Sequence, residues 1–249
     1  MNKTLNTTNE NTQKFDHNKY NHLCYMCVLD FEATCWNESD KSNNNILLEK
    51  VTQKNKNIYK PKSCMEIIEF PSVMIEWNMK TGETRKLGEF QEYCQPLSSE
   101  ISKFSEELTG ITQDIVDRPN PKYNNKPNKF PKTLHRHYKW MESVVPFIEK
   151  QKHVYIITVG LWDIQKQLPR DLKRWGIRIQ SIPDVYQQFY DIKFEYKRYF
   201  HRQQEFSNIK KDRHPTRGFG MANMLKGLNL TLDGRHHSGI DDCRNTAKI

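Results

Sequence analysis

The stretch that decides the fold reads CVLDFEATCW and runs from Cys27 to Trp36. Its small apolar residues predict a buried strand, yet the strand ends on two carboxylates, Asp30 and Glu32. Residues i and i+2 of a strand face the same side of the sheet, so both carboxylates point the same way. Two like charges at an apolar strand end cost free energy unless a cation binds them. The pair therefore predicts either exposure to water or a cation site.

A second apolar strand also ends near an acid. The segment IITVGLWDI, residues 156–164, places Asp163 just past the carboxyl end of this strand. In open α/β sheets, functional sites collect outside the carboxyl ends of the strands. Two strands thus bring acids to the same kind of place in the fold.

The fourth acid lies in the last segment, HHSGIDDCRNTAKI, residues 236–249. Ser238 followed three residues later by Asp241 resembles a capping box and gives Asp241 a structural role, which leaves Asp242 free to face elsewhere. The alternative for Asp242 is a solvated charge that interacts with the helix dipole. The two adjacent histidines favour a functional site, because a histidine near a metal-bound water acts as a general base.

These four acids indicate a metal site for phosphoryl chemistry. Carboxylate oxygens suit the hard cations Mg²⁺ and Mn²⁺ better than zinc. Two such ions about 3.5–4 Å apart clamp the attacking and leaving oxygens of an in-line displacement. We therefore expect phosphodiester hydrolysis with two Mg²⁺ ions, for which Mn²⁺ substitutes.

The charge of the chain favours a polyanionic partner. Its 249 residues carry a net charge of +9, which indicates nucleic acid first and an anionic membrane surface second. The mean hydropathy is −0.88, and no apolar run approaches the ~20 residues of a membrane helix. Residues 1–22 lack the apolar core of a secretory signal. We expect a protein that does not enter membranes, located in the cytoplasm, with the nucleus as a second location.

Apolar patterning predicts one α/β domain. Residues 1–22 are polar and predict a disordered tail, and residues 23–249 form the domain, with polar insertions near 38–64 and 118–132. Strands are expected within 22–35, 65–77, 89–96 and 153–160, and helices within 98–110, 133–151, 163–177, 220–230 and 238–249. The aromatic-rich segment 182–200 is ambiguous between strand and helix. Strands that come first and then alternate with helices indicate a mixed sheet.

The cysteines do not indicate zinc. Cys24 and Cys27 form a CxxC pair, but no second pair at similar spacing completes a zinc site. A redox pair is expected at a helix N-terminus, whereas this one lies inside a strand. Reduced thiols packed as small apolar groups are the expectation.

Three motifs together resemble a known family. DFEATC (30–35), GLWD (160–163) and GRHHSGIDDCRN (234–245) are similar to the three motifs of the DEDDh 3′-to-5′ exonucleases. The surrounding sequence resembles the branch of enhancer-of-RNAi exoribonucleases, which trims histone-mRNA ends and small interfering RNAs. The similarity covers roughly residues 23–249. It implies an RNase H-like fold with a central mixed five-stranded sheet flanked by helices.

The resemblance also implies roles for the acids and one histidine. Two Mg²⁺ ions would be bound by Asp30, Glu32, Asp163 and Asp242. His237, five residues before Asp242, matches the general base, and His236, five residues before Asp241, is the competing choice. We prefer His237, because its spacing matches Asp242, and Asp241 is expected to cap the helix.

Substrate contacts follow from the same resemblance. Glu32 would also touch the terminal nucleotide, and Phe31, Ala33 and Thr34 would line the 3′-terminal sugar and base. The implied activity is exoribonuclease action on single-stranded RNA 3′ ends or short overhangs, which releases nucleoside 5′-monophosphates. The alternatives are a DNA 3′-to-5′ exonuclease and a catalytically idle RNA-binding protein on the same fold. The presence of all four acids and the histidine argues against the idle protein.

Overall fold

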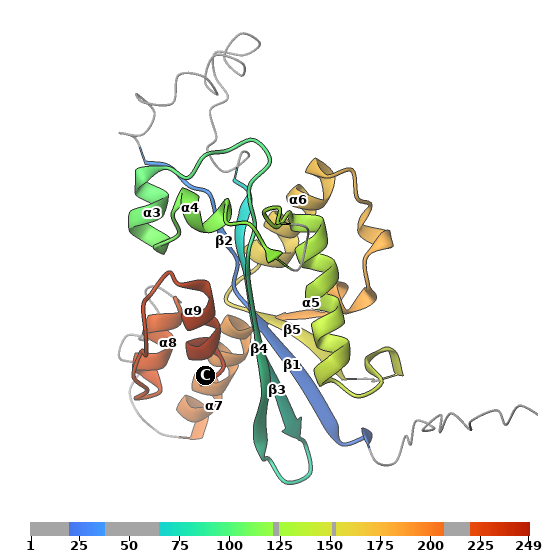
Figure 1. Cartoon of the computed structure of the whole chain (residues 1–249). Helices are drawn as coiled ribbons and strands as arrows, with labels where there is room; N and C mark the ends of the chain where they lie inside the picture. Colours follow the sequence, from blue (N-terminus) through green and yellow to red (C-terminus); the bar gives the residue numbers. More distant parts are fainter. Residues whose placement is uncertain (1–19, 38–64, 122–124, 151–152, 207–219) are drawn as a thin grey trace, which may run out of the picture.

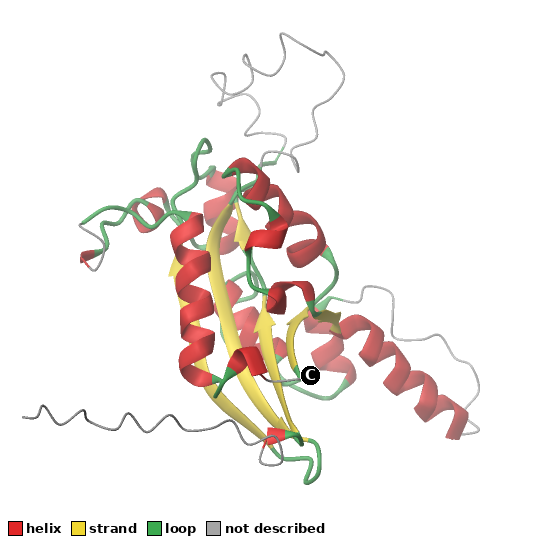
Figure 2. Ribbon diagram, turned by 90° about the vertical axis from the view of Figure 1, so that its right-hand side faces the viewer, coloured by secondary structure: helices red, strands yellow, loops and turns green. Residues whose placement is uncertain are grey.

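The computed structural model describes residues 20–37, 65–121, 125–150, 153–206 and 220–249. The insertion expected at 38–64 lies outside these residues, as does nearly all of the tail expected at 1–22. Residues 20–22 already belong to the domain, since the His22 carbonyl accepts a hydrogen bond from the Met79 nitrogen at 2.9 Å. Figures 1 and 2 show a twisted sheet with helices on both faces.

A mixed sheet forms the centre of the fold, as predicted. Its six strands are β1 (Leu23–Leu29), β2 (Glu32–Ala33), β3 (Ile67–Asn78), β4 (Thr84–Tyr93), β5 (Val154–Thr158) and β6 (Phe189–Asp191). Strand β1 lies antiparallel to β3 and parallel to β5. Strands β3 and β4 form an antiparallel hairpin, and β5 and β6 are parallel.

The sheet has six strands rather than the expected five, because the first strand is interrupted at Asp30 and forms β1 and β2. Leu29 lies opposite Ser72, and Glu32 lies opposite Glu69, so β2 continues β1 along β3 in the same register. That register places Asp30 across from Pro71, which has no N–H group to donate. The break between β1 and β2 therefore falls at Asp30, the first acid of the stretch Cys27–Trp36.

Helices cover both faces of the sheet. They are α3 (Lys103–Thr109), α4 (Gln113–Val116), α5 (Phe130–Val144), α6 (Leu168–Arg174), α7 (Ile192–Phe206), α8 (Met221–Gly227) and α9 (Gly239–Thr246). Short turns of helix are η4 (Ile148–Lys150), η5 (Asp163–Gln167), η6 (Ile179–Ser181) and η7 (Asp184–Gln187). Helix α5 packs on β3 and β4 from one side, and α9 packs on β1 and β3 from the other (Figure 1).

Alternation along β1 explains where the acids face. Tyr25, Cys27 and Leu29 point into the main core, which α5 covers. Val28 points to the opposite face, where it packs against residues of α9 such as Cys243. Because alternate residues share a face, Asp30 follows Val28 toward α9.

Several element boundaries differ from the sequence prediction. Strand β4 begins at Thr84, five residues before the expected start at residue 89, and follows a turn at Gly82, which has φ +79°. Helix α5 begins at Phe130, so the last residues of the insertion expected at 118–132 are helical. Residues 122–124 of that insertion lie outside the described residues. Helix α3 ends at Gly110, which adopts a left-handed conformation and lies at the end of the helix expected within 98–110.

Five of the six cysteines lie among the described residues, and none of these five forms a disulfide. Cys24, Cys27, Cys94 and Cys243 are free and buried, and Cys35 is free and half-buried. Within the described part of the chain, no helix is long and apolar enough to cross a membrane.

A buried polar network joins α5 to the sheet. The His137 ring lies fully inside the core, with Nε2 2.8 Å from Ser72 Oγ and Nδ1 2.7 Å from Tyr186 Oη. Burial lowers the pKa of His137 to about 3, so the ring is neutral. Both nitrogens of the uncharged ring therefore have a hydrogen-bond partner, as buried polar groups require.

Removing one partner of this network tests its contribution. Tyr186→Phe leaves Nδ1 of a buried histidine unpaired, so we expect the free energy of unfolding to fall by about 1–3 kcal/mol in urea denaturation. The control is Tyr190→Phe, because Tyr190 is 49% exposed. An equal loss in both variants would contradict the role of the network.

Candidate active site

The acidic pair of the opening stretch lies at the end of β1. Asp30 follows the last residue of β1 and is half-buried, whereas Glu32 in β2 is only 9% exposed. Both belong to the face of the sheet that α9 covers. The sequence prediction that the two carboxylates share a face agrees with the register along β3, which is the same at Leu29 and Glu32 and shifts only after Glu32.

Asp163 reaches the same place from β5. It is the first residue of η5 and is 3% exposed. Its Oδ1 accepts a hydrogen bond of 2.8 Å from the backbone nitrogen of Phe31, the residue between the acidic pair. Gly160, at φ +100°, turns the chain between β5 and η5. The ends of two strands are thus tied together by one of the acids.

Asp242 approaches from the first turn of α9. Its Oδ2 accepts a hydrogen bond of 2.9 Å from the backbone nitrogen of His237. Its Oδ1 is buried and has no hydrogen-bond partner among the described residues. A buried carboxylate oxygen without a partner is costly, so this oxygen is available to a ligand.

The neighbouring aspartate has the structural role expected for it, but not through a capping box. Ser238 is the N-cap of α9, yet its side chain makes no capping hydrogen bond. Asp241 instead accepts a bond of 3.1 Å from the Arg235 nitrogen and one of 2.8 Å from Arg244 Nη1. The arginines at 235 and 244 draw this carboxylate away from the site, which leaves Asp242 to face it.

Burial and mutual repulsion raise the pKa values of the acids. Burial, then the charges of Asp163 and Asp242, hold the pKa of Asp30 well above its usual range. Burial, then Asp30, raise the pKa of Glu32 to about 10, and burial raises that of Asp163 to about 7. The pKa of Asp242 is also raised by burial. Each acid would therefore ionise more readily with a cation nearby.

These residues fit a divalent cation. The donors are carboxylate oxygens, which hard cations prefer, and Asp242 offers an oxygen without a partner. One group of three possible metal ligands occurs among the described residues: His236, His237 and Asp242. Each of these residues has a ligand atom within 4.8 Å of those of the other two. The other three acids lie around this group at distances over which their charges interact.

The paired histidines His236 and His237 lie beside Asp242. Their rings stack edge to face with centroids 4.0 Å apart. His237 adopts φ +66°, a left-handed conformation that is uncommon for a residue with a side chain and concentrates at functional sites. Burial, then the charges of His236 and Arg235, lower the pKa of His237. His237 is therefore neutral at pH 7 and able to accept a proton.

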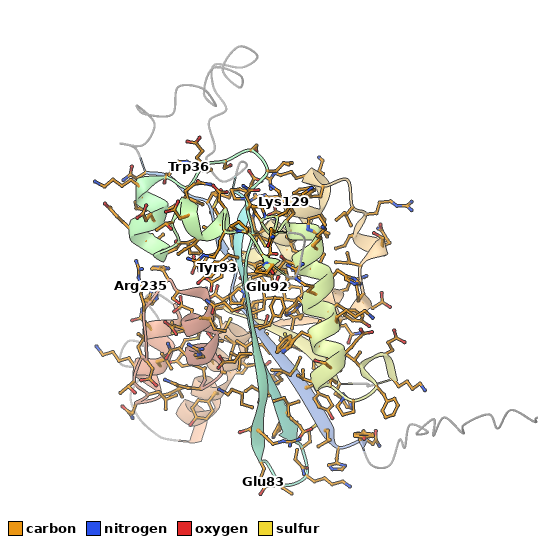
Figure 3. The ribbon with its side chains drawn as sticks, viewed as in Figure 1. Trp36, Glu83, Glu92, Tyr93, Lys129 and Arg235 are labelled. Atoms are coloured by element: carbon orange, nitrogen blue, oxygen red, sulfur yellow. The ribbon has the colours of Figure 1, made fainter. Side chains whose placement is uncertain are left out.

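The loop that carries the histidines is anchored at a distance. Arg235 Nη2 donates to the carbonyls of Glu107 at 2.6 Å and Leu108 at 3.2 Å, near the end of α3. Figure 3 shows Arg235 beside α3, on the side of the molecule that α9 occupies. Asn245 in α9 holds the start of the loop, donating to the Asp233 carbonyl at 2.7 Å. These contacts fix the loop at Asp233 and at Arg235, just before the two histidines.

Two of the three residues expected to contact a terminal sugar and base, Phe31 and Thr34, have side chains packed in the interior, and contact through their backbone stays a prediction. The Phe31 ring lies in the core with its centroid 4.6 Å from that of Phe70. Thr34 is fully buried, and its Oγ1 accepts a bond of 2.9 Å from the Glu66 nitrogen. Neither side chain is free to line a nucleotide pocket. Ala33 is buried in β2, so its proposed contact stays a prediction.

Sequence reasoning missed two residues of the site. Glu69 in β3 is a further buried carboxylate close to Asp30, and Arg235 anchors the histidine loop. An acid inside the apolar run EIIEFP, residues 66–71, was the available signal for Glu69. Arg235 left no comparable signal, because its partners are backbone carbonyls distant in sequence.

Known proteins share this sequence and fold. The exonuclease family RNase_T matches residues 27–249. The 3′-5′ exoribonuclease 1 of Rattus norvegicus is 32% identical over 226 residues, which are 90% of this chain and 51% of that protein. ERI1 exoribonuclease 2 of Xenopus laevis is 29% identical over 234 residues, 90% of this chain and 28% of that protein. The chain thus spans about half the length, or less, of these relatives.

Solved structures agree with these matches. The nuclease domain of 3′hExo, a DEDDh family member bound to rAMP, has a TM-score of 0.61 and 27% identity, covering 90% of this chain and 88% of that one. A 3′-exonuclease that recognises the 3′ end of a histone mRNA stem-loop has a TM-score of 0.62 and 27% identity, covering 91% and 80%. These are nucleases with the RNase H-like fold expected from the sequence.

Substitution of each histidine distinguishes the two candidate bases. We expect His237→Gln to lower the rate of phosphodiester cleavage by about 10²–10⁴-fold, the usual contribution of a general base. His236→Gln should keep the rate at pH 8 within about threefold, since it removes no proton acceptor from the reaction. Rates are measured on a labelled oligonucleotide at saturating Mg²⁺.

The pH profile adds a second readout. Because the base acts only when neutral, the rate falls as pH drops through the pKa of His237. The charge of His236 lowers that pKa, so His236→Gln should move the acid limb to higher pH. A rate loss in His236→Gln as large as that in His237→Gln would instead identify His236 as the base.

Proposed function

Because this chain belongs to the exonuclease family that matches residues 27–249, we propose that it hydrolyses RNA from its 3′ end to nucleoside 5′-monophosphates. The observation that carries this proposal is that the charges of Asp30, Glu32, Asp163 and Asp242 interact, and that the neutral His237 lies beside Asp242. The similarity to 3′-5′ exoribonuclease 1, at 32% identity over 90% of the chain, supports the same activity.

Exonucleases of the DEDDh family depend on divalent metal ions, and we infer that the ions here are Mg²⁺, with Mn²⁺ as a substitute. The ligands would be Asp30, Glu32, Asp163 and Asp242. Two such ions neutralise the charge that develops on the attacking and leaving oxygens of phosphoryl transfer. The unpartnered Oδ1 of Asp242 supports this ligand set.

The remaining steps belong to side chains of the protein. His237 accepts the proton of the attacking water, and its lowered pKa keeps Nδ1 or Nε2 free for that proton at neutral pH. The hydrogen bond from its backbone nitrogen to Asp242 keeps the base beside the acids. Glu32 lies within the same group and is the acid assigned to contact the terminal nucleotide.

The substrate is proposed to be RNA with a single-stranded 3′ end or a short overhang. Two similar structures contain rAMP or concern a histone mRNA stem-loop, and the net charge of +9 favours a polyanion. DNA is the alternative substrate, because metal ions and acids act on the phosphate common to both polymers. Location in the cytoplasm, with the nucleus second, stays a prediction.

A degradation assay with one acid removed tests the proposal. RNA and DNA oligomers of equal sequence, labelled at the 5′ end, are incubated with Mg²⁺. We expect the RNA to shorten from its 3′ end, and Asp30→Asn to slow this by about 10³-fold, because bound metal contributes several kcal/mol to the transition state.

The matched control is Asp184→Asn, which removes an exposed carboxylate of η7 and should leave the rate unchanged. If neither polymer shortens with the wild-type chain, the enzyme proposal is wrong. If DNA is degraded and RNA is spared, the DNA exonuclease is the correct alternative.

A further inference from the structure

Glu69 is a fifth carboxylate at the site, outside the four acids assigned to the metal. It lies in β3 directly opposite Glu32 and is 1% exposed. Its charge acts on both Asp30 and Glu32. Burying an acid beside four others costs free energy of folding. Interactions of Glu69 with other elements must offset this cost.

Both oxygens of Glu69 are engaged by groups from other elements. Oε1 accepts a hydrogen bond of 2.8 Å from Gln91 Nε2 on β4. Oε2 accepts one of 3.1 Å from the backbone nitrogen of Gly239, the first residue of α9. The first N–H groups of a helix lack partners within the helix and favour a negative charge. Glu69 thus joins β3, β4 and the N-terminus of α9.

The start of α9 packs against the strand end without room for a side chain. A Cβ atom at Gly239 would lie 2.7 Å from Pro71 Cγ, 2.8 Å from the Asp30 carbonyl oxygen and 3.0 Å from Glu69 Oε2. Backbone therefore meets backbone where Asp30 leaves β1. Asp242 follows Gly239 by three residues, so the seating of this one residue sets where Asp242 points.

We propose that Glu69 is a positioning residue that seats α9, and with it Asp242 and His237, against Asp30. This inference rests on the proposed nuclease function, since it assigns Glu69 a part in arranging that site. Glu69 acts through hydrogen bonds, since each of its oxygens accepts one from another element. A displacement of about 1 Å in a catalytic group is enough to cost about 10²-fold in rate.

Two substitutions at Glu69 separate the hydrogen bonds from the charge. Glu69→Ala removes both bonds, and we expect kcat on RNA to fall by about 10–100-fold while KM stays within about twofold. Glu69→Gln keeps an oxygen that accepts from Gly239, and the Gln91 amide can turn to pair with the new amide. We therefore expect Glu69→Gln to keep kcat within about threefold of wild type.

The chain supplies a matched control at Glu89. This acid also joins β4 to α9, through Arg244, with Nη2 to Oε2 at 2.6 Å. The pair is exposed, and its Arg244 contacts Asp241 rather than one of the four acids assigned to the metal. Glu89→Ala should leave kcat within about twofold of wild type, even if it lowers stability, since exposed pairs contribute little to local geometry.

A second measurement does not require activity. Amide hydrogen exchange of a peptide covering residues 238–243 should quicken by about tenfold or more in Glu69→Ala and stay near wild type in Glu69→Gln. If the wild-type chain cleaves no RNA, the nuclease proposal fails while this exchange still tests the seating of α9. The positioning role is overturned if Glu69→Ala keeps wild-type kcat or exchange, or if Glu89→Ala matches its losses.

Discussion

The hydrogen bond from the Phe31 backbone nitrogen to Asp163 Oδ1, 2.8 Å long, joins the two strand ends that carry the acids. It lies within the break between β1 and β2, since Phe31 belongs to neither strand. Without this link, repulsion between neighbouring buried carboxylates would favour their separation. The site depends on backbone contacts that keep like charges together until a cation is bound.

Backbone N–H groups also hold carboxylates on the side of the site formed by α9. Asp242 accepts a hydrogen bond from the His237 nitrogen, while its second oxygen stays without a partner. Glu69 holds the nitrogen of Gly239, and Arg235 holds the carbonyls that end α3. Hydrogen bonds to the backbone thus set the positions of Asp163, Asp242 and Glu69, whereas the charges of the carboxylates stay largely uncompensated. This division explains how an electrostatically costly site persists in a stable fold.

Sequence patterns identified the acids more reliably than their surroundings. Asp30 and Asp163 each end an apolar run, so a strand edge and a shared site followed from the spacing alone. The strand break at Asp30 did not follow, because it arises from Pro71 on a distant strand. Asp241 was correctly given a structural role, but its partners are arginines rather than the expected cap. Phe31 and Thr34 were expected in the substrate pocket, yet packing places both side chains in the interior.

Proton release on metal binding tests the central claim most directly. Burial and neighbouring acids raise the pKa of Glu32 to about 10, and burial raises that of Asp163 to about 7, so protons must leave when a cation binds. Calorimetric titration of the protein with Mg²⁺, repeated in buffers of different ionisation enthalpy, counts these protons. We expect at least about one proton released per protein at pH 7, and fewer as the pH rises. Mg²⁺ binding without proton release between pH 6 and 8 would contradict a site built from mutually repelling carboxylates.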